Sequence, residues 1–156
     1  MATEIERKFL VTGDGWRANS SATPYRQGYL STEVERNVRV RLKGDKATLT
    51  VKGKARGAEG ITRLEYQYDI PTEDATALLE LCEKPLIEKV RHKLDVGGLE
   101  WVIDEFSGDN AGLIVAEVEL ESEDQPFERP SWIGEEVSHD TRYLNANLVS
   151  HPYKDW

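Results

Sequence analysis

Charged side chains alternate with other residues in several short runs of this sequence. In the first run, Glu4, Glu6 and Lys8 alternate with Ile5 and Phe9. Because residues two apart in a β-strand project from the same face, the charged side chains of each run would share one face. The same spacing recurs through Arg39, Arg41 and Lys43; Thr50, Lys52 and Lys54; Arg63, Glu65 and Gln67; Lys89, Arg91 and Lys93; and Glu117, Glu119 and Glu121. Carboxylates gather in the first and last runs, and cations gather in the runs between them.

This separation of charges favours a binding site. For any single strand the simpler interpretation is a solvated sheet face, since Lys, Arg and Glu normally stay in water, but such a face usually mixes both signs within each strand. If the sheet closes into a barrel with its polar face inward, its cations require a multiply charged anion, because buried like charges are costly. Phosphate chains meet that need, and carboxylate oxygens suit Mg²⁺ or Mn²⁺ bridging the same phosphates.

The elements that would position these residues are mostly strands. Period-two alternation, interrupted by Gly, Pro, Asp and Asn, predicts about eight antiparallel strands. They cover residues 4–11, 25–32, 37–43, 47–53, 62–70, 86–96, 99–106 and 114–121. The predicted fold is mainly β (α+β), with helices packed outside the sheet.

Two helices are predicted. The first begins at Thr72, expected to be its cap, has an apolar stripe that includes Leu78 and Leu79, and ends before Pro85. The second spans residues 138–150, with a capping-type start at Ser138. The glycine-rich residues 53–60 are predicted to form a mobile loop.

Length and composition indicate a single domain over residues 1–156. The formal net charge of −9 argues against nucleic-acid or anionic-membrane partners, because both need a basic surface. The start of the chain has no basic and apolar leader pattern, so we expect a cytoplasmic protein. The single Cys82 is expected to be a buried apolar residue, and the three scattered histidines do not indicate zinc. Ala55 after Gly53-Lys54 excludes a P-loop.

The opening Glu4-Ile5-Glu6-Arg7-Lys8 resembles the Glu-x-Glu-x-Lys signature of the CYTH superfamily, the triphosphate tunnel metalloenzymes. Further matches follow in the family's order along nearly the whole chain. They are Arg39-Val40-Arg41, Thr50-Val51-Lys52, Arg63-Leu64-Glu65, Lys89-Val90-Arg91, Asp104-Glu105-Phe106, Glu117-Val118-Glu119, and Glu136-Val137 followed by Asp140, Arg142, Tyr143 and Asn145. The resemblance is strongest to short bacterial members and implies an eight-stranded antiparallel closed tunnel with a polar lumen.

The resemblance also implies roles for individual residues. Glu4, Glu6, Asp104, Glu117 and Glu119 would hold divalent metal, with Asp104 either a ligand or a carboxylate behind the ligands. Lys8, Arg39, Arg41, Lys52 and Arg91 would bind phosphates, with Lys89 as an additional contact, and Glu4, Glu6, Lys8 and Lys52 would be catalytic. One departure is Gln67, where the family commonly has a second Glu after Glu65; this weakens the case for a metal or base role of Glu65.

The predicted activity is divalent-metal-dependent hydrolysis of a small triphosphate, foremost inorganic triphosphate, by a metal-activated water in a cation-lined tunnel. The alternatives are an adenylyl cyclase that makes cyclic AMP from ATP, a thiamine triphosphatase, and a non-catalytic binder of polyphosphate or nucleotide. The acidic ligand set disfavours the binder, and nothing in the sequence indicates a base pocket for a cyclase. A small barrel is also compatible with a homodimer.

Overall fold

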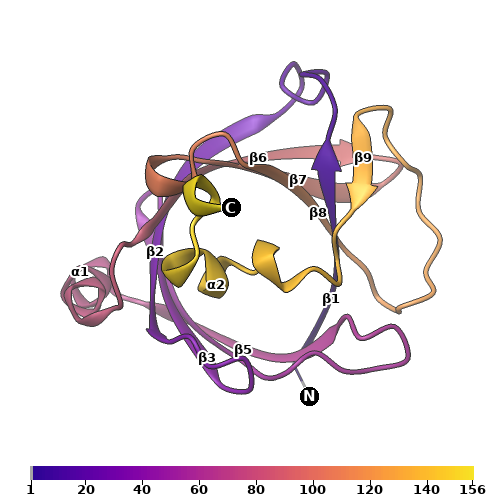
Figure 1. Ribbon diagram of the computed structural model, residues 1–156. Helices are drawn as coiled ribbons and strands as arrows, with labels where there is room; N and C mark the ends of the chain where they lie inside the picture. The colour runs from indigo at the N-terminus through magenta and orange to yellow at the C-terminus, as the bar shows by residue number, and fades with distance from the viewer. Residues whose placement is uncertain (1) are drawn as a thin grey trace.

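Eight antiparallel strands surround a central space (Figure 1), in a computed structural model that describes residues 2–156. The strands are β1 (Thr3–Val11), β2 (Ser21–Ser31), β3 (Asn37–Lys43), β4 (Lys46–Lys52), β5 (Thr62–Ile70), β6 (Ile87–Val96), β7 (Leu99–Phe106) and β8 (Ile114–Glu119). Their order is β5-β4-β3-β2-β6-β7-β8-β1, and pairing of β1 with β5 closes the sheet. The predicted eight-stranded closed barrel is therefore confirmed.

The closure between β1 and β5 is short. It consists of Thr3 opposite Leu64, Glu4 opposite Arg63 and Ile5 opposite Thr62. A ninth strand, β9 (Ile133–Glu136), pairs with β1 near Phe9 and Val11, beyond the reach of β5. Strand β9 was not predicted, because four residues do not establish an alternating pattern.

Alternation along the strands places apolar side chains outside the barrel. Phe9, Trp101 and Val118 pack on the outer face of β1, β7 and β8, where β9 and the segment 120–132 cover them. The indole of Trp101 is fully buried in this outer-face core. The cover over this face is a loop and a short strand, not a helix.

Helix α1 (Thr72–Leu81) packs outside the barrel, as predicted (Figure 1). Its Ala75 and Leu79, with Cys82 at its end, cover Val40 and Ala47 of β3 and β4. The N-cap residue is Pro71, so the prediction that Thr72 caps the helix is wrong. Cys82 is buried, as expected for an apolar role. Across residues 2–156, no helix is long and apolar enough to cross a membrane.

The second predicted helix differs from the structure in extent and in place. Its region forms a 3₁₀ turn at Thr141–Tyr143 and a short helix α2 (Asn145–Ser150), separated by Leu144 in an extended conformation. Ser138 is not a cap; its hydroxyl accepts a hydrogen bond from the Lys8 amide. Helix α2 lies across one end of the barrel (Figure 1), so the prediction that all helices pack outside is wrong for α2.

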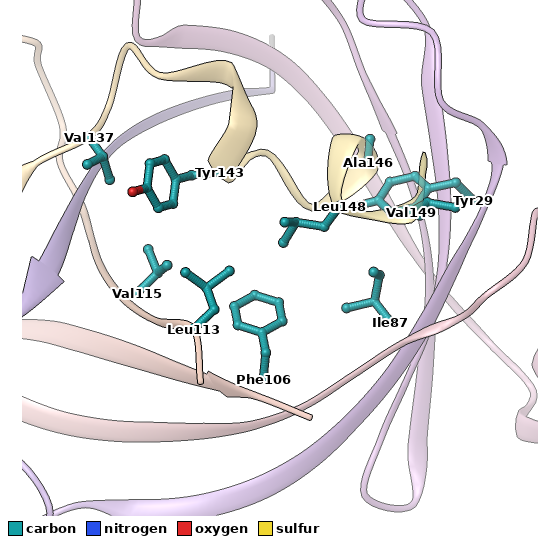
Figure 2. Close-up of a cluster of buried hydrophobic side chains, with 10 residues drawn as sticks. All are labelled: Tyr29, Ile87, Phe106, Leu113, Val115, Val137, Tyr143, Ala146, Leu148 and Val149. Atoms are coloured by element: carbon teal, nitrogen blue, oxygen red, sulfur yellow. The ribbon is translucent and has the colours of Figure 1, made fainter. Parts of the chain in front are cut away.

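An apolar cluster holds α2 in this position. Figure 2 shows side chains of α2 and its preceding turn facing residues of the barrel wall. The cluster comprises Tyr29, Ile87, Phe106, Leu113, Val115, Val137, Tyr143, Ala146, Leu148 and Val149. Burial of this cluster holds α2 at one end of the barrel. Two further 3₁₀ turns lie at Gly108–Asn110 and Tyr153–Asp155.

The irregular segment 53–60 is anchored by one acidic side chain. The carboxylate of Glu123 accepts hydrogen bonds from the amides of Glu59 and Ile61, at 2.9 and 3.3 Å, and from the Thr62 hydroxyl at 2.7 Å. The predicted loop is confirmed as irregular, apart from an isolated bridge between Arg56 and Thr62.

Gly28 gives a test of the contact between α1 and the barrel. A Cβ atom at Gly28 would lie 2.7 Å from both the Cys82 Cβ and a Leu86 methyl carbon. We expect Gly28→Ala to lower the free energy of unfolding by about 1–3 kcal/mol, because overpacking forces the backbone to shift. Urea denaturation measures this loss. The control is Gly15→Ala, because a Cβ atom at Gly15 would make only an ordinary contact, so the loss of unfolding free energy should be smaller. Gly98 is unsuitable as a control because its φ is positive. Equal losses would contradict the close packing.

Candidate active site in the barrel lumen

The inward faces of the strands line a cavity of about 380 Å³. Nine lysines and arginines and six glutamates contribute to its wall: Lys8, Arg39, Arg41, Lys43, Lys52, Arg63, Lys89, Arg91 and Lys93, with Glu4, Glu6, Glu65, Glu100, Glu117 and Glu119. Ser138, Leu144, Asn145 and Ala146 of the C-terminal segment line the cavity as well. The acidic protein therefore concentrates much of its positive charge inside the barrel, in the predicted strands and on the predicted face.

Four glutamates from β1 and β8 form an acidic part of this wall. The register places Glu6 opposite Glu119 and Lys8 opposite Glu117, while Glu4 lies two residues before Glu6 on the same face. Burial raises the pKa of Glu6 well above its usual range, and the neighbouring charges of Glu117 and Glu4 raise it further. Burial and Glu4 also raise the pKa of Glu119. The four carboxylates repel one another and would gain from a bound cation.

Two lysines lie among these carboxylates. The Lys8 ammonium is 3.9 Å from Glu6 and 3.8 Å from Glu117. The Lys52 ammonium is 2.9 Å from Glu4 and 3.5 Å from Glu65. Burial would raise the pKa of Glu4, but the Lys52 ammonium, a hydrogen bond with Glu65 and the charge of Arg39 together lower that pKa to about 2. Both predicted catalytic lysines thus lie beside the predicted metal-binding glutamates.

Arg39 and Arg41 are buried cations without a carboxylate partner among the described residues. Arg39 donates to the Thr50 hydroxyl at 3.2 Å, and its Nε has no hydrogen-bond partner. Arg41 donates from Nε to the Gln27 side-chain oxygen at 2.8 Å. Burial lowers the pKa of Arg41, and the like charges of Arg39 and Arg91 add to that effect. This pair is therefore suited to an anion held in the cavity.

Asp104 is fully buried and contacts cations rather than the acidic wall. Its carboxylate is 2.7 Å from the Lys89 ammonium, and Arg91 donates to both of its oxygens at 2.8 and 2.9 Å. Burial would raise the pKa of Asp104, but Arg91 and Lys89 together hold it far below its usual range. Of the two predicted roles for Asp104, this geometry favours a carboxylate behind the ligands, which serves as counter-ion to Lys89 and Arg91, over a metal ligand.

Gln67, where the sequence departs from the family pattern, and Glu65 both line the cavity among its charged residues. Gln67 accepts a hydrogen bond from the Thr50 hydroxyl at 3.0 Å, and Thr50 in turn accepts from Arg39. The departure from the family pattern at Gln67 therefore supports an arginine of the cavity. Glu65 lies next to Lys52 and Glu4, and burial together with Glu4 raises its pKa.

Several uncharged residues at the lumen had no role assigned from the sequence, among them Asn145, which was named only in the match to the family. Tyr25 of β2 lines the cavity, and Gln27, on the same face of that strand, is fully buried and accepts a hydrogen bond from Arg41. The Asn145 side-chain oxygen accepts from Gln27 at 3.0 Å and from Lys89 at 2.8 Å, which joins α2 to the cationic wall. Alternation of Tyr25, Gln27 and Tyr29 in the second predicted strand was the available signal, but none of these side chains is charged.

Comparisons with known proteins agree with this architecture. The family model described as the CYTH domain matches residues 2–153. The chain is 50% identical over 157 residues to an inorganic triphosphatase of Acetivibrio thermocellus, covering 100% of this chain and 99% of that relative. An inorganic triphosphatase of Nitrosomonas europaea is 40% identical over 154 residues, covering 94% and 97% of the two chains.

Solved structures have the same fold. The crystal structure of the inorganic triphosphatase NE1496 superposes with a TM-score of 0.67 at 36% identity, covering 96% of this chain and 95% of that one. The PH1012 protein from Pyrococcus horikoshii OT3, at 16% identity, has a TM-score of 0.60 over 76% of this chain and 79% of its own, which is a likeness of fold alone. The chain belongs to the CYTH domain family.

Proposed function

We propose that this protein is an inorganic triphosphatase, a phosphoric anhydride hydrolase that binds its substrate in the barrel lumen with a divalent metal ion. The observation that carries this proposal is the pair of buried arginines, Arg39 and Arg41, which lack a carboxylate partner among residues 2–156 and face the same cavity as four mutually repelling glutamates. The negative charge of a triphosphate would neutralise the two arginines, and a divalent cation would neutralise the glutamates. The names of two relatives, at 50% and 40% identity, support the same activity.

The acidic wall fits a divalent cation. Glu4, Glu6, Glu117 and Glu119 offer hard oxygen donors, the type that Mg²⁺ and Mn²⁺ prefer. Burial, with the charges of Glu117 and Glu4, raises the pKa of Glu6, so its ionised form would gain from a bound cation. As the side chains stand, no three His, Cys, Asp or Glu residues within 2–156 converge in a metal-binding arrangement. Lys52 contacts Glu4 at 2.9 Å, so metal binding would compete with this ion pair.

The residues of this chain would bind and orient the phosphates. Arg39, Arg41 and Arg91 present guanidinium groups that can contact phosphate oxygens in pairs, while Lys8 and Lys52 are compact positive charges among the glutamates. A divalent ion, when bound, would neutralise phosphate charge and lower the pKa of a water molecule. The fixed cations would stabilise the negative charge that develops on the leaving oxygen. We further propose that the whole chain acts as a single domain, since the family match covers residues 2–153.

Product analysis separates this function from its alternatives. Purified protein with Mg²⁺ or Mn²⁺ is given inorganic triphosphate, ATP or thiamine triphosphate, and orthophosphate and cyclic AMP are measured. We expect orthophosphate release to be fastest from inorganic triphosphate, and no cyclic AMP. Faster release from thiamine triphosphate, or cyclic AMP from ATP, would replace the proposal with the corresponding activity. Binding without turnover would favour a non-catalytic polyphosphate binder.

The pKa of Glu6 predicts how metal binding depends on pH. A carboxyl whose pKa is raised by folding contributes stability at low pH and loses that contribution as the pH rises through its folded-state pKa. The metal-free protein should therefore lose this contribution between the usual glutamate range and the raised pKa of Glu6. Mg²⁺ should offset the loss, so its addition should raise the melting temperature more at about pH 8 than at about pH 5. Calorimetry in EDTA and in Mg²⁺ measures both shifts. An equal or larger shift at the lower pH would contradict the assignment.

A further inference from the structure

Tyr25 lies between two arginines of the proposed phosphate-binding wall. Its strand β2 runs between β3, which carries Arg41, and β6, which carries Arg91. The guanidinium carbon of Arg41 is 4.8 Å from the centre of the Tyr25 ring, and that of Arg91 is 4.9 Å from it. Tyr25 is only 5% exposed and lines the cavity. One buried aromatic ring therefore contacts two cations that come from opposite neighbouring strands.

The ring would attract both cations, although they repel each other. The face of an aromatic ring is negative, and a guanidinium within about 6 Å of its centre is stabilised, more strongly when water is excluded. Arg91 is a source of the repulsion that lowers the pKa of Arg41. The ring thus offsets part of the cost of holding two positive charges in one cavity before an anion arrives.

Each arginine has a second contact that fixes its orientation. Arg41 donates from Nε to Gln27, and Arg91 donates from Nε and Nη2 to Asp104. A hydrogen bond on one edge and an aromatic contact on the plane define the position of a guanidinium group. Within residues 2–156, the two terminal nitrogens of Arg41 and Nη1 of Arg91 make no hydrogen bond, so they remain available to phosphate oxygens.

We propose that Tyr25 is a positioning residue that prepares Arg41 and Arg91 for the triphosphate, and that its ring rather than its hydroxyl has this effect. The inference rests on the proposed function, because it assigns Tyr25 a part in substrate binding. It predicts that an aromatic ring is required at residue 25 and that the hydroxyl is dispensable. A ring that holds the arginines in place before the substrate arrives would lower the cost of binding.

The test compares Tyr25→Phe, which keeps the ring, with Tyr25→Leu and Tyr25→Met, which remove it and differ in how well they fill the space. Tyr68→Leu, on the outer face of β5 and 57% exposed, is the matched control for loss of a tyrosine. The dissociation constant of inorganic triphosphate is measured by calorimetry in EDTA, where turnover is absent, and KM and kcat are measured with Mg²⁺. Thermal denaturation identifies variants that are folded under the assay conditions.

We expect Tyr25→Leu and Tyr25→Met to raise the dissociation constant and KM by about 10- to 100-fold, the effect of losing two buried cation–π contacts. Because these contacts would act on binding, kcat should change by less than about threefold. Tyr25→Phe should restore binding to within about threefold of the wild type, since it keeps the ring. A purely structural role would not separate KM from kcat in this way.

Equal weakening in Tyr25→Phe and the two aliphatic variants would overturn the inference, since the hydroxyl would then be the active group. Wild-type binding in both aliphatic variants, or a loss confined to kcat, would overturn it too. If one aliphatic variant does not fold, the other decides between these results. Wild-type protein that neither binds nor hydrolyses inorganic triphosphate would instead overturn the proposed function, and this inference with it.

Discussion

Glu6→Gln is expected to lower kcat/KM for inorganic triphosphate by at least about 100-fold. Loss of a residue that only hydrogen-bonds a metal ligand already lowers metal affinity or activity by about 10- to 100-fold, and loss of a ligand should cost more. Glutamine keeps the shape of the side chain but loses the negative charge that would bind a divalent ion. Glu6 lies opposite Glu119; burial raises its pKa, and repulsion from Glu117 and Glu4 raises it further. The same substitution therefore removes a repulsive charge and should leave the metal-free protein at least as stable as the wild type.

Steady-state kinetics and urea denaturation in EDTA measure the two effects of Glu6→Gln separately. The control is Glu35→Gln, because Glu35 is exposed in the turn between β2 and β3, away from the cavity. We expect the control to match the wild type in both measurements. Full activity of Glu6→Gln would contradict a role in metal binding. Lost activity together with a lower free energy of unfolding in EDTA would indicate a structural role instead.

Asp104→Asn should give the largest loss of stability among the residues of the lumen. Asp104 is fully buried against Lys89 and Arg91, and neutralising it leaves two buried cations without their counter-ion. Breaking a buried ion pair from one side typically costs about 3–5 kcal/mol. We expect the free energy of unfolding to fall by about that amount, and triphosphate binding to weaken because the two cations lose their anchor.

Denaturation in EDTA distinguishes the counter-ion role of Asp104 from a metal-ligand role. A counter-ion is needed without metal, so the loss should appear fully in EDTA. A metal ligand would matter only when metal is present, and its neutralisation would leave the metal-free protein unchanged or stabilise it. The control is Asp109→Asn, which breaks an exposed ion pair with Lys154 and should cost less than about 1 kcal/mol.

The strands and most of the charged lumen could be predicted because side chains in a strand alternate with a period of two. Glu4, Glu6 and Lys8 share a face in any extended conformation, whatever their partners. Closure of the barrel could not be predicted from this alternation. It depends on three residue pairs between β1 and β5, which are distant in sequence and carry no local signal. The resemblance to a known family supplied that part of the prediction.

The position of α2 and the partners of Asp104 depend on contacts between distant segments. An apolar set such as Ala146, Leu148 and Val149 has the same pattern whether it covers a sheet or closes the end of a barrel. Asp104 meets Arg91 through the register of β6 and β7, which the sequence does not specify. Tyr25 and Gln27 were not predicted because neither side chain is charged, although Tyr25 lines the cavity and Gln27 accepts a hydrogen bond from Arg41.

The most direct test of the account is metal-dependent hydrolysis of inorganic triphosphate. Protein treated with EDTA and then freed of chelator is assayed for orthophosphate release while Mg²⁺ or Mn²⁺ is added back. We predict no turnover without metal, saturable turnover as metal is restored, and little recovery in Glu6→Gln. Turnover that persists in excess EDTA, or that Glu6→Gln supports as well as the wild type does, would contradict a metal-dependent triphosphatase site in the lumen.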